Sequence, residues 1–141
     1  MFQLNPVLAG DTTTIGSLGL CSVLLMRDTR YPWLILVPAI PGLVEIGDLD
    51  RDDRIRLMDE TDTAAKALSR LFTPDKINIG ALGNIVRQLH VHIVARNQGD
   101  PAWPGPVWGH SAAEDYSTTA LNTRVAEMRE TLNMSSAAPA N

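Results

Sequence analysis

The chain has 141 residues, of which 45% are hydrophobic and 20% charged, and its formal net charge is −4. This length fits one domain with its own core, and the negative charge excludes a nonspecific binder of nucleic acid polymers, which needs surplus Lys and Arg. No apolar run approaches the roughly 20 residues of a membrane-spanning helix, and the N-terminus has no signal-peptide pattern. The single cysteine, Cys21, can form no internal disulfide, which fits a reducing compartment. We therefore expect a cytoplasmic protein, and the lack of a long apolar run leads us to expect no membrane partner.

The first half of the chain predicts strands followed by one long helix. Residues 12–19 read as a short strand and turn, although Asp11 could instead cap a brief helix. Residues 20–26 and 33–37 are apolar and β-branched, and the charged turn between them makes them a predicted hairpin. A helix is expected to begin in the acidic segment 48–53 and to continue for about six turns until Pro74.

The second half predicts two strands, an irregular loop and a closing helix. The strands are expected at 76–79 and 88–95, and the helix at 114–132. Three prolines in segment 100–109 forbid regular structure there. Sequential hairpins with helices on one side of a sheet predict the α+β class. We expect one domain over residues 1–134 and a disordered tail over residues 135–141.

Segment 88–94, Gln-Leu-His-Val-His-Ile-Val, says most about function. Polar and apolar residues alternate, which is the pattern of a strand with one dry and one wet face. The pattern places Gln88, His90 and His92 on one face. A neutral imidazole is a nucleophile near pH 7, so two of them beside an amide indicate a site for chemistry or binding.

These residues resemble the motif of the histidine triad (HIT) superfamily, His-x-His-x-His with apolar x. The resemblance extends to Asp28 before the apolar strand that ends at Pro38, and to the Asn/Gly segment upstream of the histidines. It implies a five-stranded antiparallel sheet with a long helix and a C-terminal helix, usually in a homodimer. It also implies a nucleotide hydrolase or nucleotidyl transferase, with a small nucleotide as substrate and no cofactor or metal.

The resemblance assigns a role to each matching residue. His90 would attack the α-phosphorus and form a nucleotidyl-histidine, while His92 would hold the phosphate. Asp28 would accept from the ribose hydroxyls. The developing charge on the phosphate would be neutralised near three further positions, namely Asn78, Gly80 and Asn84.

Two positions depart from the family pattern. Gln88 replaces the first histidine of the triad and cannot protonate a leaving group, which favours leaving groups such as polyphosphates. It can still act in catalysis by orienting His90 or by bonding a phosphate oxygen. Trp33 stands where many members have a supporting histidine, and it can donate one hydrogen bond without titrating. A second hypothesis therefore stays open, a nucleotide- or metal-binding module without turnover that uses the same histidine pair. A metal would need a third ligand, which the sequence does not readily offer.

For several other residues, a purely structural interpretation competes with a functional one. Trp103 and Trp108 either cover the site or contact a second subunit, with packing inside the chain preferred. Arg30, Arg87 and Arg96 could contact phosphate, but solvated charges are the preferred interpretation. His110 is interpreted as incidental.

Overall fold

A computed structural model of the chain describes residues 1–134, so the expected tail over 135–141 lies outside the described residues. The predicted class is confirmed: an antiparallel five-stranded sheet, in the order β1-β2-β3-β5-β4, packs with helices. The strands are β1 (Thr12–Ser17), β2 (Cys21–Met26), β3 (Trp33–Pro38), β4 (Lys76–Gly80) and β5 (Val91–Arg96). The predicted hairpin is the β2–β3 pair, in which Cys21 lies opposite Pro38.

A short helix, α1 (Pro6–Asp11), precedes the sheet and was not predicted. Its N-cap is Asn5, whose side chain accepts a hydrogen bond from the backbone N–H of Val7, and Pro6 follows at the first helical position. Asp11 is the last residue of this helix, so its alternative role as the cap of a following helix is wrong. Asn followed by Pro was the signal that could have revealed α1.

The two longer helices begin at side-chain caps. The long helix α2 (Arg51–Phe72) follows a 3-10 turn over Ile46–Asp48 and begins where Asp50 accepts from the backbone N–H of Asp53. It ends at Thr73, which adopts a left-handed conformation just before Pro74. The closing helix α3 (Thr118–Thr131) begins later than predicted, because Ser117 and no earlier residue caps it.

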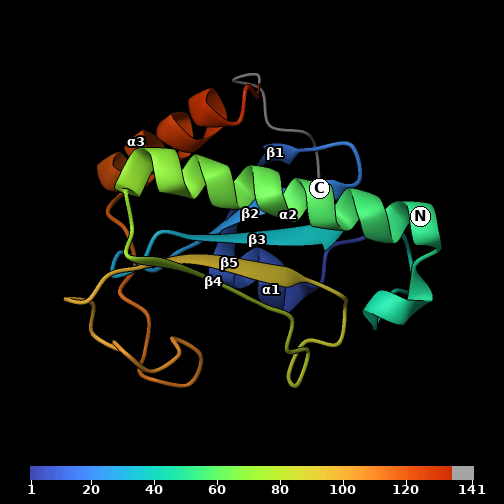
Figure 1. The fold of residues 1–141 in the computed structure, drawn as a ribbon, viewed down its shortest axis with the longest axis horizontal. Helices are drawn as coiled ribbons and strands as arrows, with labels where there is room; N and C mark the ends of the chain where they lie inside the picture. The colour runs from blue at the N-terminus through green and yellow to red at the C-terminus, as the bar shows by residue number, and fades with distance from the viewer. Residues whose placement is uncertain (135–141) are drawn as a thin grey trace.

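The sheet separates two different environments (Figure 1). Helices α2 and α3 cover one face, in front of the strands in this view, while α1 lies behind the sheet. Val91, Ile93 and Ala95 pack into the core on the α2 side. The alternate residue Val94 belongs to a second cluster, with Trp33 and Leu8 of α1. Within residues 1–134 no long helix covers the opposite face, so this face is open to hold a site.

Strand β5 begins at Val91, so the prediction of one strand over 88–95 is wrong at its start. Leu89 donates its backbone N–H to the carbonyl of Leu43, in the segment before α2, and not to a neighbouring strand. Among the described residues no helix is long and apolar enough to cross a membrane.

Candidate active site

A pocket of about 480 Å³ opens on the face of the sheet away from α2. His90 and His92 lie at one wall, and Val7 and Leu8 of α1 bring apolar side chains to another. Segments 82–86 and 107–113 complete the pocket. The two histidine rings contact each other edge to face, with centroids 4.9 Å apart. Strand pairing and two loops thus bring together residues far apart in the sequence.

His90 is held by the backbone two residues before it. Its Nδ1 lies 2.6 Å from the carbonyl oxygen of Gln88, and a carbonyl oxygen can only accept a hydrogen bond. The proton of the neutral ring is therefore on Nδ1, and Nε2 carries the lone pair. The ring is only 6% exposed, so it is held in place as well as oriented.

His92 is held by a side chain on the neighbouring strand. The indole Nε1 of Trp33 donates to its Nδ1 over 3.0 Å. Burial, followed by the proximity of His90, lowers the pKa of His92 from 6.5 to about 3. The ring is therefore neutral at ordinary pH, because charging it would require removing a cation from water.

The side chain of Gln88 does not join the two histidines. Its Oε1 accepts from the backbone N–H of Asn5 over 2.9 Å, and its Nε2 donates to the carbonyl oxygen of Gln3 over 2.9 Å. Both ends of the amide are thus engaged by the segment that leads into α1. The expectation that one strand face carries all three side chains is wrong for Gln88, because β5 starts only at Val91, whereas His90 and His92 do line the same pocket.

Trp108 covers His92 from the proline-rich loop. Their ring centroids are 5.4 Å apart, and Trp108 also contacts Trp33 edge to face. Gly80, which lies opposite His92 in the β4–β5 pair, makes room for this ring: a Cβ there would be 3.0 Å from Cη2 of Trp108. Trp108 therefore packs inside the chain, as the preferred interpretation had it. In this position its ring also covers His92.

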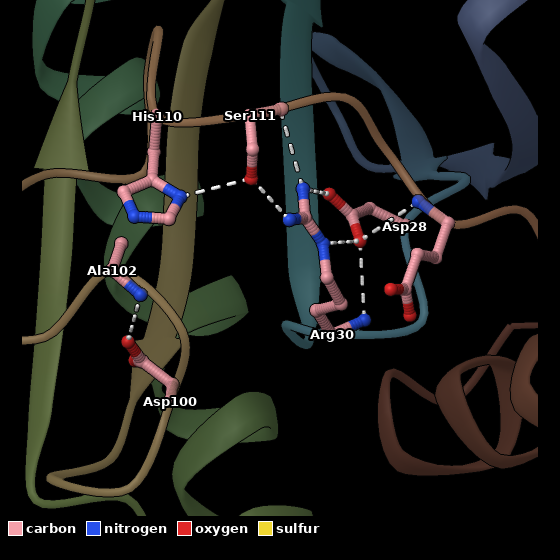
Figure 2. Close-up of polar contacts among 7 residues, drawn as sticks. Asp28, Arg30, Asp100, Ala102, His110 and Ser111 are labelled. Atoms are coloured by element: carbon pink, nitrogen blue, oxygen red, sulfur yellow. Dashed lines mark hydrogen bonds and ion pairs between the residues drawn. The ribbon is translucent and has the colours of Figure 1, made fainter.

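Asp28 lies at the pocket, where its buried carboxylate forms an ion pair with the partly buried Arg30 (Figure 2). Its carboxylate accepts from the guanidinium and backbone N–H of Arg30 and from the backbone N–H of Glu114. Burial alone would raise the pKa of Asp28, but the hydrogen bonds from Arg30 outweigh it and the pKa lies below its usual value. Arg30 also donates to Ser111, which His110 contacts in turn, so Arg30 is not a solvated charge.

The two asparagines lie in different places. Asn84 is exposed and lines the pocket, next to Gly83, whose φ of +74 turns the loop. Asn78 lies outside the pocket lining, where its Oδ1 accepts from Nη1 of Arg96 over 2.8 Å. Arg96 is 1% exposed and pairs with Asp100, which anchors the proline-rich loop to β5.

A second, smaller pocket of about 260 Å³ adjoins the first at His90, Gly83 and Leu82. Arg87 and Gln88 line it, together with residues 44–47. Among the described residues no group of three His, Cys, Asp or Glu side chains could hold a metal ion.

Comparison with known proteins identifies the family. The HIT domain family matches residues 9–99, so this chain belongs to the HIT family. It is similar to the histidine triad (HIT) protein of Sinorhizobium meliloti 1021, with 48% identity and a TM-score of 0.90 over 92% of this chain and 96% of that one. It is also similar to a histidine triad protein of Marinobacter aquaeolei VT8, with 44% identity and a TM-score of 0.92 over 94% and 97%.

A third relative shares the fold alone. A zinc-bound histidine triad family protein of Mycobacterium smegmatis is 18% identical, with a TM-score of 0.63 over 90% of this chain and 89% of that one. A comparison with curated proteins finds no match.

Proposed function

We propose that this protein is a nucleotide hydrolase or nucleotidyl transferase in which His90 attacks the α-phosphorus of a nucleoside phosphate. The observation that carries the proposal is the hydrogen bond from Nδ1 of His90 to the carbonyl oxygen of Gln88. It leaves the lone pair on Nε2, in a ring that borders both pockets. A neutral imidazole with one nitrogen held and the other free is the form that acts as a nucleophile.

In the first step, Nε2 of His90 forms a bond to the α-phosphorus, and the bond to the leaving-group oxygen breaks with its electron pair. The His90 ring then carries phosphorus on Nε2 and a proton on Nδ1, and it is positive. The carbonyl of Gln88 already accepts that Nδ1 proton, so this bond strengthens as the charge develops. No proton has to move when the nucleotidyl-histidine forms.

In the second step, water or another acceptor attacks the same phosphorus and loses a proton to solvent, while the bond to Nε2 breaks and its electron pair returns to the ring. His90 returns to its starting form. His92 lies beside the reacting ring and is the proposed donor to a phosphate oxygen. With water the reaction is hydrolysis, and with another acceptor it is nucleotidyl transfer.

The pocket offers a place for the rest of the nucleotide. Leu8 and Ile35 are buried apolar residues in its lining, which suits a base or ribose face. Asn84 is the exposed polar side chain proposed to contact the phosphate. We propose that Asp28 acts through Arg30, since its carboxylate is occupied, and that Gly80 acts by admitting Trp108.

The leaving group follows from the position of Gln88. Its amide is engaged by Gln3 and Asn5 and has no proton to give near neutral pH. We propose that substrates carry a leaving group that departs as an anion, as in a phosphoanhydride. The alternative is a nucleotide-binding module without turnover. The lack of a proton donor at position 88 favours this alternative as well.

Product analysis separates these alternatives. The protein is incubated with a dinucleoside polyphosphate and, separately, with a nucleoside phosphoramidate, and the nucleotide products are quantified. We expect cleavage of the anhydride that is lost in His90→Gln, with the same nucleotide still bound by the variant. Nucleotide binding without any product from the wild type would establish the binding module instead.

We also propose that the protein forms a homodimer, as the resemblance implies. Ile79 on the edge strand β4 and Ile55 and Met58 on α2 are exposed apolar side chains that a second copy could cover. Light scattering coupled to size exclusion tests this directly. A mass of one chain at micromolar concentration would contradict it.

A further inference from the structure

Trp33 of β3 and His92 of β5 are joined by a hydrogen bond between their side chains, across two neighbouring strands of the sheet. In the β3–β5 pair Trp33 lies opposite Val94 and Ile35 lies opposite His92, so the indole reaches His92 diagonally across the sheet. Trp33 is 5% exposed and His92 is 8% exposed. Their rings are also in contact, with centroids 5.6 Å apart.

The direction of this hydrogen bond fixes the protonation form of His92. An indole N–H can donate but has no lone pair with which to accept. Nδ1 of His92 must therefore carry the lone pair, and the proton of the neutral ring is on Nε2. Adding a second proton would place two N–H groups against each other, with the indole hydrogen bond lost.

The surroundings offer no compensation for a charged ring. The groups against His92 are the rings of His90, Trp33 and Trp108, and Ile35 and Gly80 lie opposite it on the two neighbouring strands. The charged side chains that line the same pocket are Asp11, Asp28 and Arg30. Asp28 and Arg30 pair with each other, and no carboxylate hydrogen bonds to His92 in the described part of the chain.

We propose that Trp33 is a positioning residue that keeps His92 neutral, with its proton on Nε2, and so gives the site an uncharged donor whose strength does not change with pH. A histidine at position 33 could exchange its own proton with His92 and leave both tautomers accessible. The indole removes that freedom. The two site histidines are then complementary, since His90 offers a lone pair at Nε2 and His92 offers a proton at Nε2.

The protonation form of His92 does not depend on the proposed reaction, whereas its use toward a phosphate oxygen rests on the proposed function. The first can be tested without any substrate. Protein labelled with ¹⁵N in its histidine rings is titrated from pH 8 to pH 5, and the nitrogen shifts of His92 are followed by NMR. We expect a neutral ring with the proton on Nε2 throughout.

Two matched variants locate the cause. In Trp33→Phe the aromatic ring remains but the indole N–H is lost, and we expect His92 to show a mixture of tautomers or to titrate within the range. Trp108→Phe removes the other indole that contacts His92, whose Nε1 has no partner among the described residues, and the Nε2 form should persist. If Trp33→Phe does not fold, the wild-type titration still decides the protonation form of His92. The variant Trp33→His then serves as the second test, because a histidine at position 33 can exchange its proton with His92, and we expect His92 to titrate in it.

The proposal is overturned if wild-type His92 titrates between pH 8 and pH 5 or carries its proton on Nδ1. It is also overturned if Trp33→Phe, folded, leaves the His92 shifts unchanged. A wild type that shows the expected tautomer but cleaves no nucleotide would contradict the proposed function and leave the role of Trp33 standing.

Discussion

Gln88 holds His90 with its backbone and the N-terminal segment with its side chain. The carbonyl oxygen of Gln88 accepts from Nδ1 of His90, while its amide bonds the backbone of Gln3 and Asn5. The residue that replaces the first histidine of the triad thus connects the proposed nucleophile to the segment that leads into α1. Its contribution is predicted to be structural and not acidic.

Gln88→Ala should therefore destabilise the fold and leave the leaving-group preference unchanged. Two hydrogen bonds to backbone groups are lost, which corresponds to about 1–3 kcal/mol in the free energy of unfolding. Denaturant unfolding measures this, with Gln98→Ala as the control, since Gln98 is exposed and is bonded to the described residues through its backbone N–H. A drop in kcat/KM confined to phosphoramidate substrates would show instead that Gln88 assists the leaving group.

The free energy of unfolding should decrease as the pH falls below 6.5, because of the lowered pKa of His92. The pKa of His92 is about 3 in the folded chain and near 6.5 when unfolded, so below pH 6.5 the unfolded state binds a proton that the folded state does not. Unfolding becomes easier as the pH falls toward 3, by roughly 2 kcal/mol at pH 5.

Urea unfolding between pH 7 and pH 5 measures the loss for the wild type, His92→Gln and His110→Gln. The first variant should flatten the pH dependence, and the second, at an exposed histidine, should not. Equal slopes for wild type and His92→Gln would mean that another group takes up the proton.

Gly80→Ala should displace Trp108 from His92. The added methyl would lie 3.0 Å from Cη2 of Trp108, closer than ordinary packing allows, so the indole must shift. Overpacking of this kind costs about 1–3 kcal/mol, and the altered indole environment should change the tryptophan fluorescence. Gly99→Ala is the matched control, because a Cβ there meets nothing within 4 Å. An unchanged spectrum and stability in Gly80→Ala would show that Trp108 does not depend on the glycine.

Much of the fold followed from local patterns, but the arrangement of the site did not. The acidic start of α2, its stop before Pro74 and the β2–β3 hairpin depend on neighbouring residues, which a sequence shows. The position of the Gln88 side chain depends on Gln3 and Asn5, which are distant in the sequence. Strict alternation over 88–94 suggested a continuous strand, yet the hydrogen bond from Leu89 to Leu43 ends the pairing early.

The expected substrate contacts could not be predicted from local sequence either, because they depend on residues distant in the chain. Asp28 and Asn78 were placed in the site because of their position along the chain. In the fold, their oxygens are occupied by Arg30 and Arg96. Trp108 was noted only as one of two alternatives, because nothing local shows that a proline-rich loop folds back over β5.

Chelation should leave activity unchanged. His90 acts as the nucleophile in the proposed reaction, and the described residues contain no group of three side chains suited to a metal. Turnover of a dinucleoside polyphosphate is compared before and after dialysis against EDTA. Activity that is lost on dialysis and restored by zinc would contradict this prediction and indicate a metal-dependent site.

The configuration at the reacting phosphorus tests the central claim most directly. A substrate with a chiral α-phosphorothioate is hydrolysed in ¹⁸O-labelled water, and the configuration of the product is determined. Attack by His90 followed by attack of water inverts the phosphorus twice, so the account predicts overall retention. Inversion would show a single direct attack by water and would contradict a nucleotidyl-histidine at His90.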